Sequence, residues 1–250
     1  MVTGAARRLD QALVERGLFD SRERARRAVM AGLVDVGGRR VDKPGTPVGF
    51  DAELTVRGPA EPFVSRAGRK LAGALDHFGV DPAGLRCLDV GASTGGFTDC
   101  LLQRGAREVT ALDVGYGLLD GRLRADPRVA VVERVNARHL EAGSLGPPFD
   151  LVVADLSFIS ILKVAPALLP QLAPGGRLLT LIKPQFEVGR GAVGKGGIVR
   201  DEELRQRVVA ERAAGLAALG LELVGTVDSA VAGAEGNLEA FALLIRPEGG

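Results

Sequence analysis

The chain has 250 residues, of which 46% are hydrophobic and 25% charged, and its formal net charge is +1. This length accommodates one large domain or a standard domain with a small one, and the apolar content is ample for a core. No N-terminal run resembles a signal peptide and no apolar run approaches the ~18 residues of a membrane span, so we expect a cytoplasmic protein. Cys87 and Cys100 lack paired ligand spacing, so we expect buried free thiols and no metal site.

Charge is distributed unevenly along the chain. Residues 1–70 hold 14 Lys and Arg against 9 Asp and Glu, a balance of +5. The remaining residues hold 18 against 22, a balance of −4. A basic region suits a polyanion partner or a solvated helix face, and charge alone does not decide between them.

The first elements in chain order predict a small α+β module. Residues 8–17 have the spacing of an amphipathic helix, with Leu9, Leu13 and Leu18 directed inward. A second helix over residues 22–31 is predicted to be capped by Ser21. Alternating residues around a pair of glycines then predict a tight β-hairpin, which a loop follows.

The pattern over residues 8–56 resembles the alpha-L RNA-binding module of a small-subunit ribosomal protein, tyrosyl-tRNA synthetases and pseudouridine synthases. It has the spacings L-D-x-x-L, S-R-x-x-A and G-x-V-x-V-x-G-x. The resemblance implies contacts to RNA backbone from the second helix and the loop after the hairpin, through Arg22, Arg26, Arg27 and Lys43. Arginine donates bidentately to phosphate, and no aromatic platform accompanies these residues, so we expect phosphate and shape recognition.

A proline- and glycine-containing stretch at residues 57–62 is interpreted as an interdomain linker. We therefore expect an RNA-binding domain over residues 1–58, a linker over 59–64 and a second domain over 65–250. Ser65 is predicted to cap the helix that follows the linker. By spacing alone, Lys70 on this helix is an ordinary surface residue whose stem lies along the apolar stripe.

Residues 87–98 predict a strand, a glycine-rich turn and a helix, the corner that holds nucleotides in an open α/β sheet. Such a turn lets backbone amides approach a ligand beside a helix N-terminus. Ser93 stands where a dinucleotide fingerprint needs glycine, which favours a different nucleoside ligand. The strand over 109–113 ends in Asp113, where a ribose-binding acid belongs, and Asn136 follows the third strand in a position to reach an adenine.

Two later strands, over residues 151–155 and 178–182, end in opposite charges. Because a buried lysine is unfavourable unless it is paired, the neighbouring ends Asp155 and Lys183 are interpreted as catalytic. Residues 185–200 are interpreted as a glycine-rich substrate loop. Asp201 is predicted to cap the next helix, and antiparallel strands over 221–227 and 239–245 close the sheet.

Residues 63–246 resemble Rossmann-like S-adenosylmethionine methyltransferases of the ribose 2'-O-methylating FtsJ kind, and the whole chain resembles the TlyA family of ribosomal RNA methyltransferases. The segments that carry this resemblance are 65–71, 89–97, 155–158, 182–187, 196–201 and 236–239. One departure is that the chain has no tryptophan before Val64, where family members often carry one. The resemblance implies an α/β Rossmann-like sheet and a catalytic tetrad of Lys70, Asp155, Lys183 and Glu239.

The resemblance also implies a cofactor and a substrate. S-adenosylmethionine is expected to bind through Gly91, Ser93, Thr94, Gly95, Phe97, Asp113, Asn136 and Asp155. The expected reaction is 2'-O-methylation of cytidine in large-subunit ribosomal RNA. Because some relatives also modify the small-subunit RNA, that RNA is a second expected substrate. Two alternatives stay open: a NAD-dependent oxidoreductase, which Ser93 and the two lysines disfavour, and a haemolysin-like membrane-active protein, which has no membrane-type stripe to support it.

Overall fold

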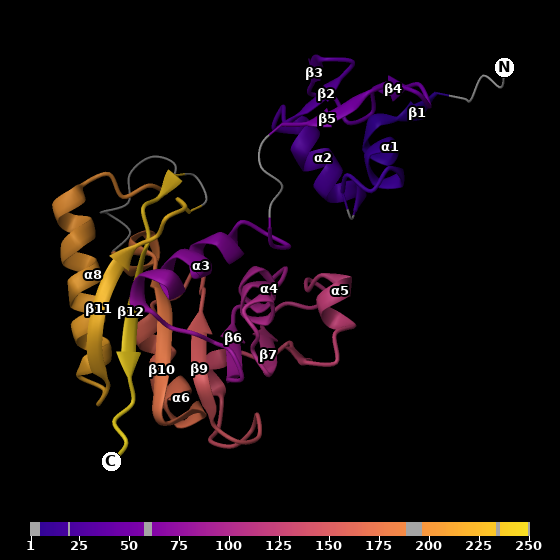
Figure 1. The fold of residues 1–250 in the computed structure, drawn as a ribbon. Helices are drawn as coiled ribbons and strands as arrows, with labels where there is room; N and C mark the ends of the chain where they lie inside the picture. Colours follow the sequence, from indigo (N-terminus) through magenta and orange to yellow (C-terminus); the bar gives the residue numbers. More distant parts are fainter. Residues whose placement is uncertain (1–5, 20, 58–61, 189–196, 234–235, 250) are drawn as a thin grey trace. The chain divides into compact units, whose positions relative to one another are not determined.

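The structure is a computed structural model that describes residues 6–19, 21–57, 62–188, 197–233 and 236–249. The chain divides into two compact units, residues 1–60 and 61–250 (Figure 1). The first unit has one hydrophobic core, and the second has a core on each face of its central sheet.

The first unit packs two helices against short strands. Its elements are β1 (Arg7–Arg8), α1 (Leu9–Glu15), α2 (Arg22–Met30), β2 (Val34–Val36), β3 (Arg39–Val41), β4 (Pro47–Val48) and β5 (Leu54–Val56). β2 lies between β3 and β5 and is antiparallel to both, while β1 pairs with β4. Leu9, Leu13 and Val29 are fully buried, so the apolar faces of the two predicted helices form this core.

Two local predictions for this unit have opposite outcomes. Ser21 caps α2 as predicted, because its side chain accepts a hydrogen bond from Arg24 N at 3.3 Å. The prediction that Leu18 points inward is wrong, since this residue is 40% exposed. Helix α1 ends at Glu15, and Gly17 has a φ of +69° that takes the chain out of the helix before Leu18.

The second unit is built on a seven-stranded sheet with the order β11-β12-β10-β9-β6-β7-β8 (Figure 1). Its strands are β6 (Arg86–Val90), β7 (Glu108–Asp113), β8 (Val129–Glu133), β9 (Phe149–Ala154), β10 (Leu172–Ile182), β11 (Glu222–Asp228) and β12 (Ala240–Ile245). β12 is antiparallel to both β10 and β11, whereas the other neighbouring strands pair in parallel. The predicted α/β Rossmann-like class is confirmed.

Helices cover both faces of this sheet. They are α3 (Ala67–Phe78), α4 (Gly96–Gln103), α5 (Gly121–Arg124), η1 (Ala137–His139), η2 (Ile161–Lys163), α6 (Ala165–Leu168), η3 (Leu169–Gln171), α7 (Pro184–Glu187) and α8 (Glu202–Ala217). Alternate residues of β9 enter opposite cores: Val153 packs with α3 and α4, and Val152 with α6 and α8. A strand covered on both faces is apolar throughout, which explains the predicted run. Asp201 caps α8 as predicted, accepting a hydrogen bond from Leu204 N at 3.0 Å.

Cys87 and Cys100 are free and buried in the core beneath α3 and α4, as the sequence predicts. Burial raises the pKa of each thiol to about 12. Within the part of the chain that the structure describes, no helix combines the length and the apolar character needed to cross a bilayer.

Candidate active site

The strand β6 runs into a glycine-rich turn that leads directly to α4. Gly91, Ser93 and Gly95 have φ angles of +85°, +49° and +94°. This region suits glycine but strains a serine. A Cβ atom on Gly91 would stand 2.6 Å from the carbonyl oxygen of Asp155. The turn therefore passes the end of β9 at a distance that only glycine permits.

Helix α3 begins differently from the prediction, and the difference involves this turn. Ser65 does not cap α3, whose N-cap is Arg66, with no side-chain capping bond. The Ser65 Oγ instead lies 2.2 Å from the place that a Cβ on Gly96 would occupy. The segment before α3 thus packs against the first turn of α4, where Gly96 has no room for a side chain.

A cavity of about 170 Å³ opens beside the turn at the carboxyl edge of the sheet. It is lined by Ser65, Ala67, Asp89, Gly91, Ala92, Ser93, Thr94, Gly96, Phe97, Asp155, Ser157 and Lys183. Many of the residues predicted to bind the cofactor are therefore together at one place, with one of the predicted catalytic lysines among them.

Three of the predicted cofactor residues do not line this cavity. Asp113 accepts hydrogen bonds from Ser93 N at 2.8 Å and Gly115 N at 2.7 Å, which fastens the turn to the end of β7. Asn136 is exposed and caps η1 by accepting a hydrogen bond from Arg138 N at 3.1 Å. Gly95 is buried at the N-cap position of α4. Carboxylate oxygens have further lone pairs, so these contacts leave Asp113 able to accept from a ligand.

Asp89 is fully buried at the end of β6 and has a half-satisfied carboxylate. Its Oδ2 accepts hydrogen bonds from Thr98 N at 2.9 Å and Thr98 Oγ1 at 2.7 Å. Its Oδ1 has no partner among the described residues. Burial raises the pKa of this carboxyl to about 7, and the negative charge of Asp155 adds to the rise while the Thr98 hydrogen bonds oppose it. The cavity wall thus holds an acceptor suited to a cationic or donating ligand group.

The predicted tetrad is present as two lysine–carboxylate pairs. Lys183 at the end of β10 forms an ion pair with Asp155 and donates a hydrogen bond to Ser157 Oγ at 3.1 Å. Lys70 Nζ lies 2.6 Å from Glu239 Oε2, and these two side chains are only 6% and 2% exposed. The interpretation of Lys70 as a surface residue is wrong, because Glu239 supplies a buried counter-charge that spacing along α3 does not reveal.

Other residues at this edge were not predicted as site residues. Ser157 receives the Lys183 hydrogen bond described above, and Gln185 Nε2 donates to Glu239 Oε1 at 3.2 Å. Phe158 is 89% exposed and has a φ of +65°, which is uncommon for a bulky residue. Its ring lies 4.9 Å from the ring of Phe186. The available signal was that both residues lie in segments that carry the family resemblance, Phe158 in 155–158 and Gln185 in 182–187.

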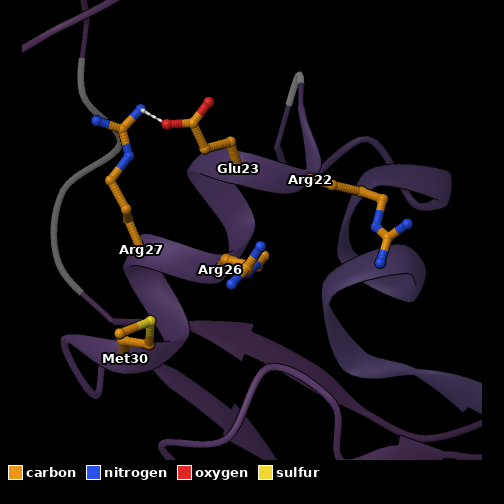
Figure 2. A pocket seen from close by; sticks show the side chains of 5 residues that line it. All are labelled: Arg22, Glu23, Arg26, Arg27 and Met30. Carbon is orange, nitrogen blue, oxygen red and sulfur yellow. Dashed lines mark ion pairs between the residues drawn. The ribbon is translucent and has the colours of Figure 1, made fainter.

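A separate groove of about 610 Å³ lies along α2 in the first unit (Figure 2). It is lined by Arg22, Glu23, Arg26, Arg27 and Met30. The Arg22 guanidinium lies 3.1 Å from Asp10 Oδ2 of α1, and the Arg27 guanidinium lies 3.7 Å from Glu23 Oε1. Arg26 forms no ion pair with any described residue. These arginines, with exposed Lys43 in the β3–β4 loop, stay predicted RNA contacts.

The structure describes only the two ends of the predicted substrate loop over residues 185–200. Residues 189–196 lie outside the described residues, as do residues 59–61 of the predicted linker over 59–64. Across the described residues, no group of three or more His, Cys, Asp and Glu side chains is arranged to hold a metal ion.

The chain is similar to known proteins along most of its length. The sequence matches the FtsJ-like methyltransferase family over residues 63–246 and the S4 domain family over residues 7–54. It is 50% identical to the 16S/23S rRNA (cytidine-2'-O)-methyltransferase TlyA of Mycobacterium tuberculosis, with 94% of this chain and 88% of the relative covered. It is 40% identical to Hemolysin A of Brachyspira hyodysenteriae, with 95% and 99% covered.

Solved structures include a hemolysin-named protein of Streptococcus thermophilus that is 39% identical to this chain. The two structures superpose with a TM-score of 0.78 over 98% of this chain and 90% of the other. Methyltransferase and hemolysin names are thus both carried by proteins similar to this one along most of their length.

Proposed function

The chain belongs to the TlyA family of FtsJ-like methyltransferases, and from this premise we propose that it methylates the 2'-hydroxyl of a cytidine in ribosomal RNA. The relative from Mycobacterium tuberculosis is named for this reaction on 16S and 23S RNA. The observation that carries the proposal is the pairing of Lys183 with Asp155 and of Lys70 with Glu239 in the methyltransferase unit. A ribosomal substrate agrees with the expected cytoplasmic location.

The residues around the cavity fit S-adenosylmethionine, which supplies an already activated methyl group. The positive-φ turn places Gly91, Ser93 and Thr94 on the cavity wall beside the N-terminus of α4, where a helix end favours a ligand with acceptor groups. The unpartnered Oδ1 of Asp89 suits a ligand that carries positive charge, as this cofactor does. We propose that Gly91, Ser93, Thr94, Gly95, Phe97, Asp113, Asn136 and Asp155 hold it. Asp113 serves the ribose and Asn136 the adenine.

Lys183 is proposed as the residue that meets the acceptor hydroxyl. Methyl transfer to a 2'-hydroxyl needs in-line alignment and the loss of a poorly acidic proton. Asp155 and Ser157 fix the direction of the Lys183 ammonium through the ion pair and the 3.1 Å hydrogen bond. In its ammonium form Lys183 donates a hydrogen bond that orients the hydroxyl. Only in its neutral amine form can Lys183 accept the proton of the hydroxyl. Glu239 orients Lys70 in the same way within the second pair.

The exposed residues of the two units are suited to different contacts with RNA. Phe158 presents an exposed ring directly after Ser157, the residue that Lys183 contacts. Aromatic rings of this kind stack on unpaired bases. The guanidinium groups of Arg26 and Arg27 are exposed on α2 and suit phosphate. We propose that the first unit supplies affinity for RNA backbone, while Phe158 contacts the acceptor nucleotide.

A methylation assay tests this function directly. Purified protein is incubated with methyl-labelled S-adenosylmethionine and with 16S and 23S RNA, both free and in ribosomal subunits. Mass spectrometry of the nuclease digest is expected to find 2'-O-methylcytidine. A label found only on bases, or no transfer to either RNA, contradicts the proposal. Calorimetric titration with NAD and a liposome leakage assay, both expected to be negative, test the oxidoreductase and membrane-active alternatives.

A further inference from the structure

Glu239 has its two carboxylate oxygens held by two different elements of the fold. Lys70 Nζ of α3 lies 2.6 Å from Oε2, and Gln185 Nε2 of α7 donates to Oε1 at 3.2 Å. A Cβ on Gly233 would stand 2.3 Å from Oε1, so the backbone of this glycine closes the remaining side. The buried carboxylate is therefore fixed by one cation and one neutral amide.

Gln185 occupies a turn that is itself firmly attached to the unit. At the other end of α7, Glu187 accepts hydrogen bonds from Ile161 N at 2.9 Å and from Arg212 Nε at 2.7 Å. Arg212 also donates to the carbonyl oxygen of Glu187 at 3.0 Å. These contacts join α7 to η2 and α8. The backbone of Gln185 is thus held at Lys183, two residues before it, and at Glu187, two residues after it.

We infer that Gln185 is a positioning residue that couples the two lysine–carboxylate pairs, an inference that rests on the proposed methyltransferase function. Its backbone continues from Lys183 of one pair, and its amide holds Glu239 of the other. Two lysines and two carboxylates balance in charge, so a neutral donor adds a second hydrogen bond to Glu239 without disturbing that balance.

The far side of the amide argues against a purely structural role. Gln185 Oε1 is buried and has no partner among the described residues. A buried acceptor without a donor disfavours the folded state, and stability alone would not select an amide here. The hydrogen bond from Nε2 to Glu239 is therefore the interaction through which this side chain acts.

Two substitutions separate the hydrogen bond from the charge balance. Gln185→Met removes the donor without adding charge, and we expect kcat to fall about 10-fold, with the KM for RNA and the Kd for S-adenosylmethionine unchanged. Gln185→Glu keeps the shape but adds a carboxylate beside Glu239, Lys70, Lys183 and Asp155. Added negative charge favours the ammonium form of both lysines. We therefore expect the acidic limb of the kcat profile to move to higher pH in the Glu variant alone.

Gln206 provides a matched control because it makes the same kind of contact on the exposed face of α8. Its Nε2 donates to Glu202 Oε1 at 2.8 Å. Gln206→Met and Gln206→Glu are expected to keep wild-type kcat and pH profile, and circular dichroism melts of all four variants verify folding. Unchanged kcat in folded Gln185→Met, or equal loss of kcat and cofactor affinity, overturns the inference while wild-type methylation upholds the proposed function. Wild-type protein that methylates no RNA overturns both.

Discussion

Lys70 and Lys183 lie among carboxylates of the catalytic sheet, whereas the arginines of α2 extend into solvent. The Lys70 side chain is 6% exposed and that of Lys183 11%, and each has one carboxylate as its ion-pair partner. The side chains of Arg22 and Arg27 are 53% and 66% exposed. Charges that are fixed and little solvated act individually, while exposed charges are screened by salt and contribute additively. The first arrangement suits chemistry and the second suits binding of a polyanion.

The largest effect should come from Lys183, the residue that we propose meets the acceptor hydroxyl. Lys183→Ala is expected to lower kcat by about 10³-fold, since positioned acid–base groups contribute on the order of 10²–10⁴. S-adenosylmethionine binding should survive, because the proposed role of Lys183 concerns the acceptor and not the cofactor. Lys163→Ala, at an exposed lysine of η2, is the control and should keep full activity.

Lys183→Arg sharpens this test of the comparison. Guanidinium keeps its proton at neutral pH, so the arginine variant is expected to be as inactive as the alanine variant. Single-turnover kinetics with saturating RNA measures the methyl-transfer step in both. Near-normal turnover in the arginine enzyme would mean that Lys183 acts only as an electrostatic positioner.

The next effect concerns stability rather than rate. Lys70→Ala leaves Glu239 buried without its cation, and breaking a buried pair typically costs about 3–5 kcal/mol of unfolding free energy. Lys70→Met combined with Glu239→Gln should recover much of that stability, because no charge stays buried, but it should not recover activity. Urea denaturation measures both variants. Equal stability of Lys70→Ala and wild type would show that the pair is solvated like a surface ion pair.

Asp89 is a buried carboxyl whose hydrogen bonds, among the described residues, come from the neutral Thr98, so it shows what burial does to a charge that has no ion-pair partner there. Its pKa of about 7 lies above the ordinary value of 3.8. The folded protein therefore keeps a proton that the unfolded chain releases, and this contribution to stability is lost as pH rises from about 4 to 7. Between pH 5 and 7 the unfolding free energy of wild type, followed by thermal melts, should fall by about 2 kcal/mol relative to that of Asp89→Asn. Parallel pH profiles of the two proteins would contradict the raised pKa.

The smallest effect is expected on α2. Arg26→Ala should weaken RNA binding by only a few-fold and lower the salt slope of log Kd by less than one, as loss of one phosphate contact does. S-adenosylmethionine affinity should be unchanged. Arg128→Ala, at an arginine of the second unit that pairs with Asp126, is the matched control. A large loss of RNA affinity from Arg26→Ala alone would mean that this arginine acts individually, as the buried lysines are expected to do, and not as one of several additive phosphate contacts.

Most of the fold and part of the site could be predicted from the sequence, for a physical reason. Strand ends that meet at one edge of a parallel sheet follow from chain order, so the sequence predicts that Asp155 and Lys183 lie together, as they do. The environment of Lys70 depends on Glu239, which lies 169 positions away in the sequence and directly precedes β12. Helical spacing describes one helix face and contains no information about a partner of that kind.

Smaller errors have the same origin. Ser65 has the right residue type for a helix cap, but the approach of Gly96 determines where its hydroxyl lies. Leu18 continues the apolar spacing of α1, yet the positive φ of Gly17 ends that spacing one residue earlier. Gln185 lies in the segment 182–187 that carries the family resemblance, but its contact with Glu239 could not be predicted, because that carboxylate comes from a distant part of the chain.

The burial of both cysteines has a practical consequence for observing this enzyme. A thiol with a pKa of about 12 has almost no thiolate at neutral pH, and thiolate is the form that reacts with alkylating reagents and oxidants. Cys87 and Cys100 should therefore stay unmodified in the folded protein. The surface of the native protein then presents no reactive thiol from these two residues. One new cysteine in each unit, at exposed positions such as Arg39 and Glu203, would accept a pair of fluorophores without removal of the native thiols. Energy transfer between them would then report the distance between the units as RNA binds.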